Sequence, residues 1–255
     1  MATTTVEIRI LGELEVRRAG RTDRPRRGHP GKGRTLLAML AVAGGSLVSM
    51  DRIIDALWLN PPRQPKQNVA ALVSRLRTDL GSAAVLGGRT GYRLAPTVGV
   101  DLHHAAALVD RAGTTLTAAV AALDLLARDT VLPEYPDADW ARPARDWHTG
   151  LLHRARTIAA RSAVTAGHPD LAATIAQAAI RDDPLDEAAY RALMAAYLAA
   201  DEPVRAVRAF HRLRTTLDHE LGLHPTPATQ HLLVHILRDG KQAGDDVKCA
   251  DELWN

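Results

Sequence analysis

The spacing of apolar residues changes within the first hundred positions of the chain. Residues 6–16 alternate apolar and polar positions on either side of Gly12, which predicts two short strands. Three segments with helical spacing follow, at residues 34–42, 49–58 and 66–80, and Ser49 is suited to cap the second one. Residues 85–94 predict a β-hairpin with a glycine-rich turn. This order of strands, three helices and a hairpin predicts a winged helix-turn-helix domain over residues 1–96.

The rest of the chain has only helical periodicity. We expect a loop or weak strand at residues 17–34 and a linker at residues 96–99, because both are rich in turn residues. The helical segments after the linker are residues 102–111, 116–127, 138–166, 170–181, 185–200, 203–220 and 227–237. Proline-containing turns at 167–169, 182–184 and 201–203 recur about every 17 residues, so two helices span the roughly 34 residues of a tetratricopeptide unit. We therefore expect a mainly α protein, with an all-α tetratricopeptide-like domain over 97–240 and a disordered tail at 241–255.

Composition agrees with helices, and the charge divides the chain in two. Apolar residues make up 46% of the chain but aromatic residues only 4%, so the cores depend on Ala, Leu and Val. Residues 1–96 carry a net charge of +9 and residues 97–255 a net charge of −6. A basic module beside an acidic one indicates nucleic-acid binding by the first and protein binding by the second. A surface imbalance without functional meaning is the alternative.

Several other classes of protein are not favoured. Cys249 is the only cysteine, which leaves no internal disulfide and fits a reducing cytoplasm. No stretch has the roughly 20 apolar residues of a membrane span, and no secretory signal is visible. Residues 28–33 lack the spacing of a phosphate-binding loop, and the histidines lack metal-ligand spacing. We expect a cytoplasmic protein with no metal, no cofactor and no catalytic site.

The third predicted helix has a polar face suited to reading DNA. On a helical wheel, apolar residues occupy the inner side, and Asp79 is the only acid between Lys66 and Gly81. Arg75 can pair with guanine, and Gln67 or Asn68 can pair with adenine, in the major groove. An ordinary solvated face is the alternative, although it would usually carry more Glu and Lys. The candidate recognition residues are Gln67, Asn68, Ala71, Ser74, Arg75, Arg77 and Thr78.

Basic residues outside this helix are candidates for contacts to the DNA backbone. Such contacts add affinity and salt dependence without reading bases. Tyr92 could equally be a core residue that holds the hairpin together. The candidates are Arg24, Arg26, Arg27, Lys32, Arg34, Arg89, Tyr92 and Arg93.

Together these features resemble the Streptomyces antibiotic regulatory protein (SARP) family, in which an OmpR-type winged helix precedes a bacterial transcriptional activation domain. The resemblance covers nearly the whole chain. It rests on the segments Ile10–Val16 (ILGELEV), Val48–Trp58 (VSMDRIIDALW), Val73–Arg77 (VSRLR), Gly91–Leu94 (GYRL) and Glu220–Leu223 (ELGL), with Pro225 and Pro227 after the last one.

The resemblance implies a transcriptional activator that binds direct repeats in promoters of antibiotic biosynthetic gene clusters. It also implies a side-by-side homodimer on double-stranded promoter DNA, and recruitment of RNA polymerase holoenzyme through its sigma factor and neighbouring subunits. The loop that faces polymerase in OmpR-type proteins corresponds here to Leu59, Asn60, Pro61, Pro62 and Arg63, and is shorter than usual. A DNA-binding repressor or inactive competitor, and a helical adaptor that binds only protein, remain the alternatives.

Overall fold

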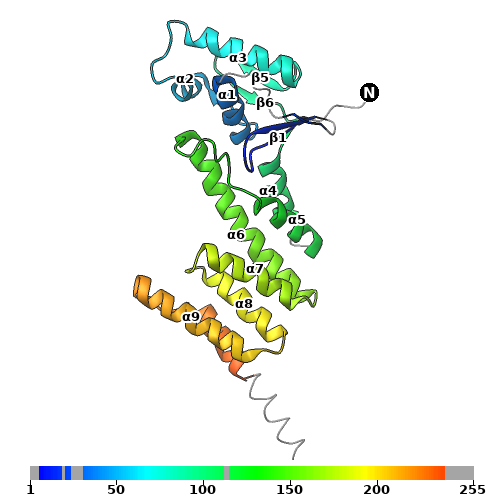
Figure 1. The fold of residues 1–255 in the computed structure, drawn as a ribbon, viewed down its shortest axis with the longest axis vertical. Coiled ribbons are helices and arrows are strands. Elements are labelled where there is room, and N and C mark those ends of the chain that lie inside the picture. The colour runs from blue at the N-terminus through cyan, green and yellow to red at the C-terminus, as the bar shows by residue number, and fades with distance from the viewer. Residues whose placement is uncertain (1–5, 19–20, 24–30, 112–114, 239–255) are drawn as a thin grey trace, which may run out of the picture. The chain divides into compact units, whose positions relative to one another are not determined.

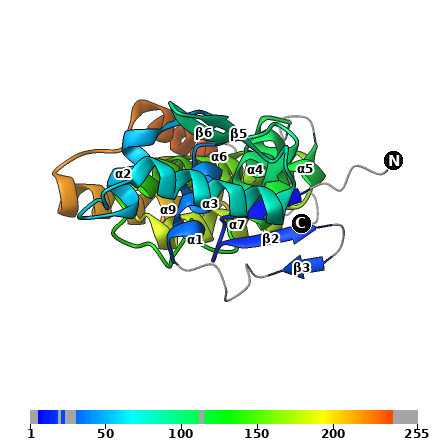
Figure 2. The same ribbon diagram turned by 90° about the horizontal axis from the view of Figure 1, so that it is seen from above.

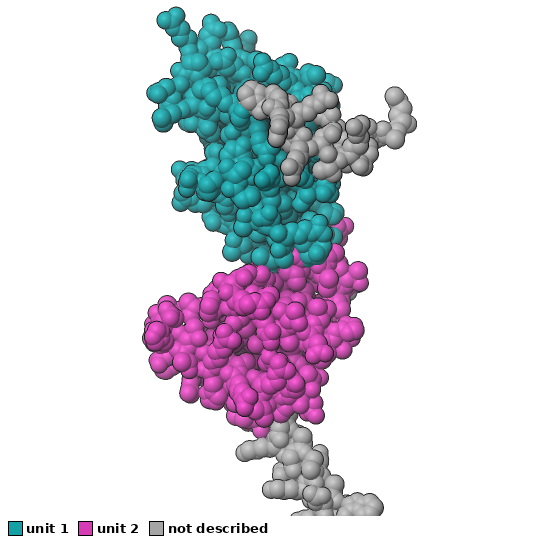
Figure 3. Space-filling view, viewed as in Figure 1, with its two compact units in different colours: residues 1–108, 124–152 teal, residues 109–123, 153–255 magenta. Residues whose placement is uncertain are grey.

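The structure is a computed structural model that describes residues 6–18, 21–23, 31–111 and 115–238. It confirms the expected mainly α protein with a small sheet region at the N-terminus. Contacts divide the chain into two compact units, coloured separately in Figure 3: unit 1 comprises 1–108 and 124–152, and unit 2 comprises 109–123 and 153–255. This division differs from the expected boundary between 96 and 97, which stays a prediction. The expected disordered tail, 241–255, lies outside the described residues.

The first sheet of unit 1 contains the two strands expected around Gly12. It is ordered β3-β2-β1-β7, with β1 antiparallel to β2 and β2 antiparallel to β3; β2 and β3 lie side by side in Figure 2. The linker expected at 96–99 is wrong, because Val98 and Val100 pair in parallel with Val6 and Ile8. This strand is too short for its alternation to stand out from a turn. The strands are β1 (Val6–Arg9), β2 (Glu15–Arg18), β3 (Arg21–Asp23) and β7 (Val98–Val100).

Three helices and a second sheet complete the winged helix (Figure 1). Ser49 caps the second helix as expected, because its Oγ accepts a hydrogen bond from the backbone N of Arg52 at 3.3 Å. Pro65 lies in the first turn of the third helix, where a missing N–H costs nothing. The helices are α1 (Gly31–Val42), α2 (Met50–Leu57) and α3 (Pro65–Leu80), and the second sheet, ordered β4-β6-β5, contains β4 (Val48–Ser49), β5 (Val85–Gly88) and β6 (Gly91–Leu94).

Asp101 joins the first sheet to the helix that follows it, α4 (Asp101–Arg111). Its carboxylate accepts hydrogen bonds from the backbone N of Ile10 at 2.9 Å, of Leu11 at 3.0 Å and of Leu102 at 2.8 Å. Only 2% of the residue is exposed. Burial raises the pKa of Asp101, while the three N–H donors and the charge of Arg9 act in the opposite direction. This carboxylate therefore holds the end of β1 and the start of α4 together.

A segment far along the chain also binds to the turn after β1. The backbone N of Leu132 donates to the carbonyl of Ile10 at 3.0 Å, and that of Gly12 donates to the carbonyl of Thr130 at 2.8 Å. The Oε1 of Glu134 accepts from the backbone N of Leu14 at 2.8 Å. Residues 130–134 therefore pack as part of unit 1, although the sequence suggested no strand or helix there.

Unit 2 is built from helices, and they pack through two clusters of buried side chains, one of which includes large residues such as Tyr190 and Phe210. Its N-terminal part has an alanine-rich core formed by Ala119, Ala159, Ala160, Ala163, Ala172, Ile175 and Ala196. Proline begins α7 and α9, 34 residues apart, as a tetratricopeptide-like repeat requires. No helix within the described ranges is long and apolar enough to cross a membrane. The helices that lie wholly or partly in this unit are α4, α5 (Leu116–Leu126), α6 (Arg142–Thr165), α7 (Pro169–Asp182), α8 (Glu187–Ala199), α9 (Pro203–Leu221) and a helix over 227–238; the short 3-10 helix η2 (Asp139–Ala141) belongs to unit 1.

Glu187 anchors the last described helix to α8. Its carboxylate accepts from Thr229 Oγ1 at 2.6 Å, and from the Oγ1 and backbone N of Thr226 at 2.8 and 3.0 Å. Burial alone would raise the pKa of Glu187, but these hydrogen bonds and the charge of Arg191 lower it below its usual value. The ionised carboxylate therefore stabilises the start of helix 227–238.

Replacing Asp101 with Ala should destabilise unit 1 by about 3 kcal/mol, because buried N–H groups would lose their acceptor. Urea unfolding followed by circular dichroism measures this loss. Asp55→Ala, which removes an exposed carboxylate from α2, is the matched control and should change stability by less than about 0.5 kcal/mol. Equal losses for the two variants would contradict the role given to Asp101.

Glu187→Gln should lower the stability of unit 2 by about 1 kcal/mol at neutral pH, because the ionised acceptor is lost. A lowered folded-state pKa contributes stability above the ordinary pKa of Glu, and this contribution disappears as pH falls through the lowered value. The difference between the variant and the wild type should therefore disappear in acid. Denaturant titrations at several pH values test this, with the exposed Glu220→Gln as control; a difference independent of pH would contradict it.

Candidate nucleic-acid interface

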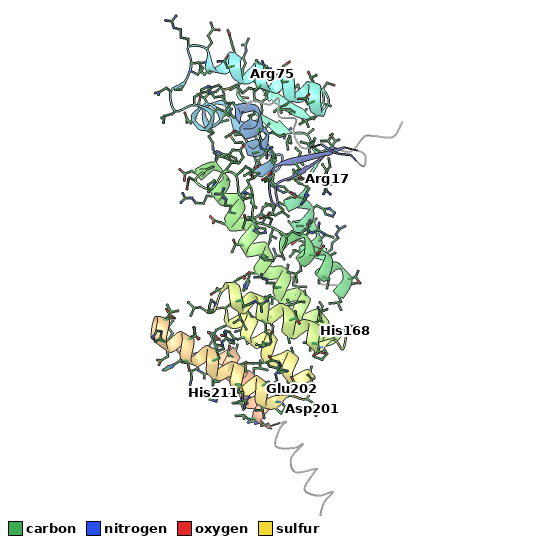
Figure 4. The ribbon with its side chains drawn as sticks, viewed as in Figure 1. Arg17, Arg75, His168, Asp201, Glu202 and His211 are labelled. Atoms are coloured by element: carbon green, nitrogen blue, oxygen red, sulfur yellow. The ribbon has the colours of Figure 1, made fainter. Side chains whose placement is uncertain are left out.

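The outer face of α3 presents six of the seven predicted recognition residues to solvent. Val69, Val73 and Leu76 are buried on the opposite face, so packing fixes which side of the helix faces outward. Figures 1 and 2 agree that α3 lies on the outer side of α1, and Figure 4 marks Arg75 on it. The exposed residues are Gln67, Asn68, Ala71, Ser74, Arg75 and Thr78.

Arg77, the seventh predicted recognition residue, contacts the hairpin instead. Its Nε donates to the carbonyl of Val85 at 2.9 Å, and its Nη2 donates to the carbonyl of Gly87 at 3.3 Å. Its guanidinium carbon also lies 6.0 Å from the centre of the Tyr92 ring. The helical wheel placed Arg77 beside the predicted reading face. A wheel considers one helix alone, so it could not show that the carbonyl groups of β5 accept hydrogen bonds from this side chain. Arg77 therefore fixes α3 to the β5–β6 hairpin.

The β5–β6 hairpin is the wing, and glycine is required at two of its positions. Gly87 has a φ of +117°, and a Cβ there would lie 2.2 Å from the carbonyl oxygen of Gly91. Gly91 has a φ of +155°, and a Cβ there would lie 2.2 Å from the carbonyl oxygen of Val48. The backbone N of Met50 also donates to the carbonyl of Thr90 at 3.0 Å. The wing is therefore held against the start of α2 as well as against α3.

The predicted backbone-contact residues of the wing have different environments. Arg89 in the turn and Arg93 on β6 are exposed. Tyr92 is only 5% exposed, so it packs in the core of the hairpin, which was the alternative to a DNA contact. Of the predicted wing residues, Arg89 and Arg93 are therefore the two whose side chains are open to solvent.

The predicted contacts near the start of α1 divide in a similar way. Lys32 is exposed, and its ammonium lies 4.7 Å from the centre of the Trp58 ring. Arg34 forms an ion pair with Glu134 at 2.9 Å, which joins α1 to residues 130–134. The loop residues Arg24, Arg26 and Arg27 lie outside the described residues. Lys32 is thus available to solvent, whereas Arg34 has a partner within unit 1.

The loop between α2 and α3 is open to solvent. Leu59 is 97% exposed, more than any other exposed large apolar side chain of the described residues. Asn60, Pro61 and Arg63 are also exposed, and Pro62 is half-buried. This loop is therefore a candidate contact surface for a second macromolecule.

One exposed cation at the interface was not among the sequence candidates. Lys66 lies in the first turn of α3, exposed beside Gln67. Its position directly before the predicted reading face was the signal that could have identified it. No acidic residue of α3 is exposed, because Asp79 is half-buried. The exposed face of α3 is therefore polar and basic, as a phosphate-rich partner requires.

Comparisons with known proteins agree with this arrangement. The family model "Bacterial transcriptional activator domain" matches residues 100–237. The transcriptional regulatory protein MoaR1 of Mycobacterium bovis is 29% identical over 268 residues, which cover 93% of this chain and 81% of MoaR1. The regulatory protein AfsR of Streptomyces coelicolor is 28% identical over 255 residues, which cover 90% of this chain and 24% of AfsR.

A solved structure has the same fold along nearly the whole chain. The structure of Mycobacterium tuberculosis EmbR in complex with a low affinity phosphopeptide has a TM-score of 0.79 and 25% sequence identity, and covers 98% of this chain and 72% of that chain. The chain belongs to the bacterial transcriptional activator domain family, and it is a transcriptional regulator of the SARP family.

Proposed function

We propose that the protein is a sequence-specific DNA-binding activator of transcription. The observation that carries this proposal is the exposed face of α3, where Gln67, Asn68 and Arg75 project and no acidic residue of the same helix is exposed. Asn and Gln side chains can pair with adenine, and Arg can pair with guanine, in the major groove. The small side chains of Ala71 and Ser74 let the helix approach the base edges.

The wing supplies a second, non-specific contact in this proposal. Arg89 and Arg93 are exposed on the hairpin that Arg77 fixes to α3. Phosphate contacts by these side chains would set the position of α3 on the duplex, and base contacts would set the sequence. Lys32 and Lys66 extend the basic surface along the same unit.

Activation requires contact with the transcription machinery, and two features support it. Leu59 in the α2–α3 loop is 97% exposed, the highest value among the exposed large apolar side chains of the described residues, so it is open to contact by a partner. The match to the bacterial transcriptional activator domain supports recruitment of RNA polymerase holoenzyme by the helical part of the chain. In this proposal the protein acts as a cytoplasmic homodimer on direct repeats in promoters of antibiotic biosynthetic gene clusters, as the resemblance to the SARP family implies; the similarity to the regulatory protein AfsR supports a role in regulation.

The proposal is tested by footprinting the purified protein on the upstream regions of its own gene neighbourhood, with random competitor DNA at near-physiological salt. Protected direct repeats are the expected result. Transcription in vitro from a protected promoter then distinguishes an activator, which increases transcript, from a repressor or competitor, which decreases it. A folded protein that protects no site would overturn the proposal.

Arg75→Ala should weaken binding to the protected site by about 1 to 3 kcal/mol, the range for one bidentate base contact. Binding to random DNA should stay unchanged, because base contacts add little there. Fluorescence anisotropy with both duplexes measures the two affinities. Arg161→Ala, which removes an exposed arginine from α6, is the control and should alter neither. Equal losses on both duplexes for Arg75→Ala would mean that Arg75 contacts only phosphate.

Arg89→Ala should weaken binding to specific and random DNA alike, because it removes a phosphate contact from the wing. The slope of log affinity against log salt concentration should decrease by about one unit. Anisotropy titrations at several salt concentrations give this slope. If the slope does not change, Arg89 lies outside the interface.

A further inference from the structure

Unit 2 contains a cavity of about 470 Å³ bordered by α7, α8 and α9. Four of its lining residues are arginines, Arg181 on α7 and Arg205, Arg208 and Arg212 on α9. The three arginines of α9 follow helical spacing, so they project from one side of that helix. We call this cavity the arginine groove.

Three of these arginines have no intramolecular counter-ion in the described part of the chain. Arg205 pairs with Glu202 at 2.6 Å, and its guanidinium carbon lies 4.2 Å from the centre of the Tyr197 ring; Figure 4 marks Glu202 before α9. Arg181, Arg208 and Arg212 form no ion pair with any described residue and are exposed. The groove therefore concentrates positive charge that the fold leaves uncompensated.

This concentration is unusual for its surroundings. Residues 97–255 carry a net charge of −6, yet the groove brings four cations together. Like charges in one concave site repel each other and raise the local potential, which favours an anionic ligand. Arginine is also the side chain best suited to pair with two oxygens of a carboxylate at once.

The walls of the groove are apolar between the arginines. Ile180, Leu193 and Ala209 line it, together with Tyr197. A ligand that carried only acidic groups would leave the apolar surface of the groove exposed to water. A ligand that also carries an apolar side chain would bury that surface, which is favourable. The groove thus fits a ligand of mixed acidic and apolar character.

The groove adjoins a second hollow of about 200 Å³. Gln177, Tyr197 and Arg205 line both, and Gln177 Nε2 donates to Tyr197 Oη at 2.9 Å. Asp170 and Glu202 line only the second hollow, so the carboxylates of a ligand belong in the arginine groove and its polar or basic groups in the second hollow. Two adjoining hollows across stacked helices suit an extended chain better than a compact small molecule. Concave surfaces of helical repeats present this kind of elongated site.

We propose that the arginine groove binds an extended acidic peptide segment of a partner protein. Carboxylates of the peptide pair with Arg181, Arg208 and Arg212, and one apolar side chain packs against Ile180 and Leu193. This binding goes beyond the proposed DNA recognition and does not rest on it, because no residue of α3 or the wing lines the groove.

The test measures binding of fluorescein-labelled peptides, in which acidic residues alternate with leucine or tryptophan, to the full-length protein by fluorescence anisotropy. Wild type should bind at least one peptide, and replacing the acidic residues with their amides should abolish binding. Arg208→Gln and Arg212→Gln should each weaken binding about tenfold, the effect expected for one charge-assisted contact. Arg214→Gln, which changes an exposed arginine of α9 that does not line the groove, should leave the affinity unchanged.

Circular dichroism melts show whether each variant is folded, and chemical-shift changes in wild type locate the bound peptide independently of any substitution. Shifts at α7, α8 and α9 support the proposal. It is overturned if no peptide binds, if Arg214→Gln loses as much affinity as Arg208→Gln, or if ATP or inorganic phosphate binds at the arginines while the peptides do not.

Discussion

The carboxylate of Asp101 is the contact on which the arrangement of unit 1 most depends. It is almost fully buried and accepts hydrogen bonds from Ile10, Leu11 and Leu102. A buried carboxylate is stable only where donors or an opposite charge compensate it, so the three backbone N–H groups and the charge of Arg9 have to converge on this side chain in the folded protein. The sheet at one side of the winged helix and the first helix after it are therefore a single structural unit.

The same kind of constraint fixes the candidate DNA-binding surface. The guanidinium of Arg77 binds two carbonyls of β5, and the backbone of Met50 binds the turn of the hairpin. Both contacts join elements that would have to meet DNA at the same time. Because the helix and the wing are bonded to each other before any DNA is present, little ordering remains to oppose binding, which favours affinity.

Strongly periodic segments and local caps could be predicted from the sequence, whereas contacts between distant segments could not. The faces of α3 and the cap at Ser49 follow from spacing within a few residues, and both are as expected. The strand at Val98–Val100 and the ion pair between Arg34 and Glu134 depend on partners about a hundred positions away. The pattern of residues within a few positions of a segment contains no information about a partner so far along the chain. The helical spacing of the arginines of α9 is visible in the sequence. That they line a groove is not, because the groove forms only where α7 and α8 pack beside α9.

The parallel pairing of β7 with β1 affects how the molecule can be divided. The family match begins at residue 100, so a cut at that boundary would divide β7 and would separate Asp101 from the end of β1 that it binds. A fragment ending at residue 96 would leave β1 as an edge strand with unpaired N–H and carbonyl groups, which promote association between copies. Oligomers formed by such a fragment would then reflect an exposed sheet edge and not the assembly of the intact regulator. In exchanges of DNA-binding domains between relatives, the transferred piece should extend beyond Asp101 and include residues 130–134, which bind the turn after β1.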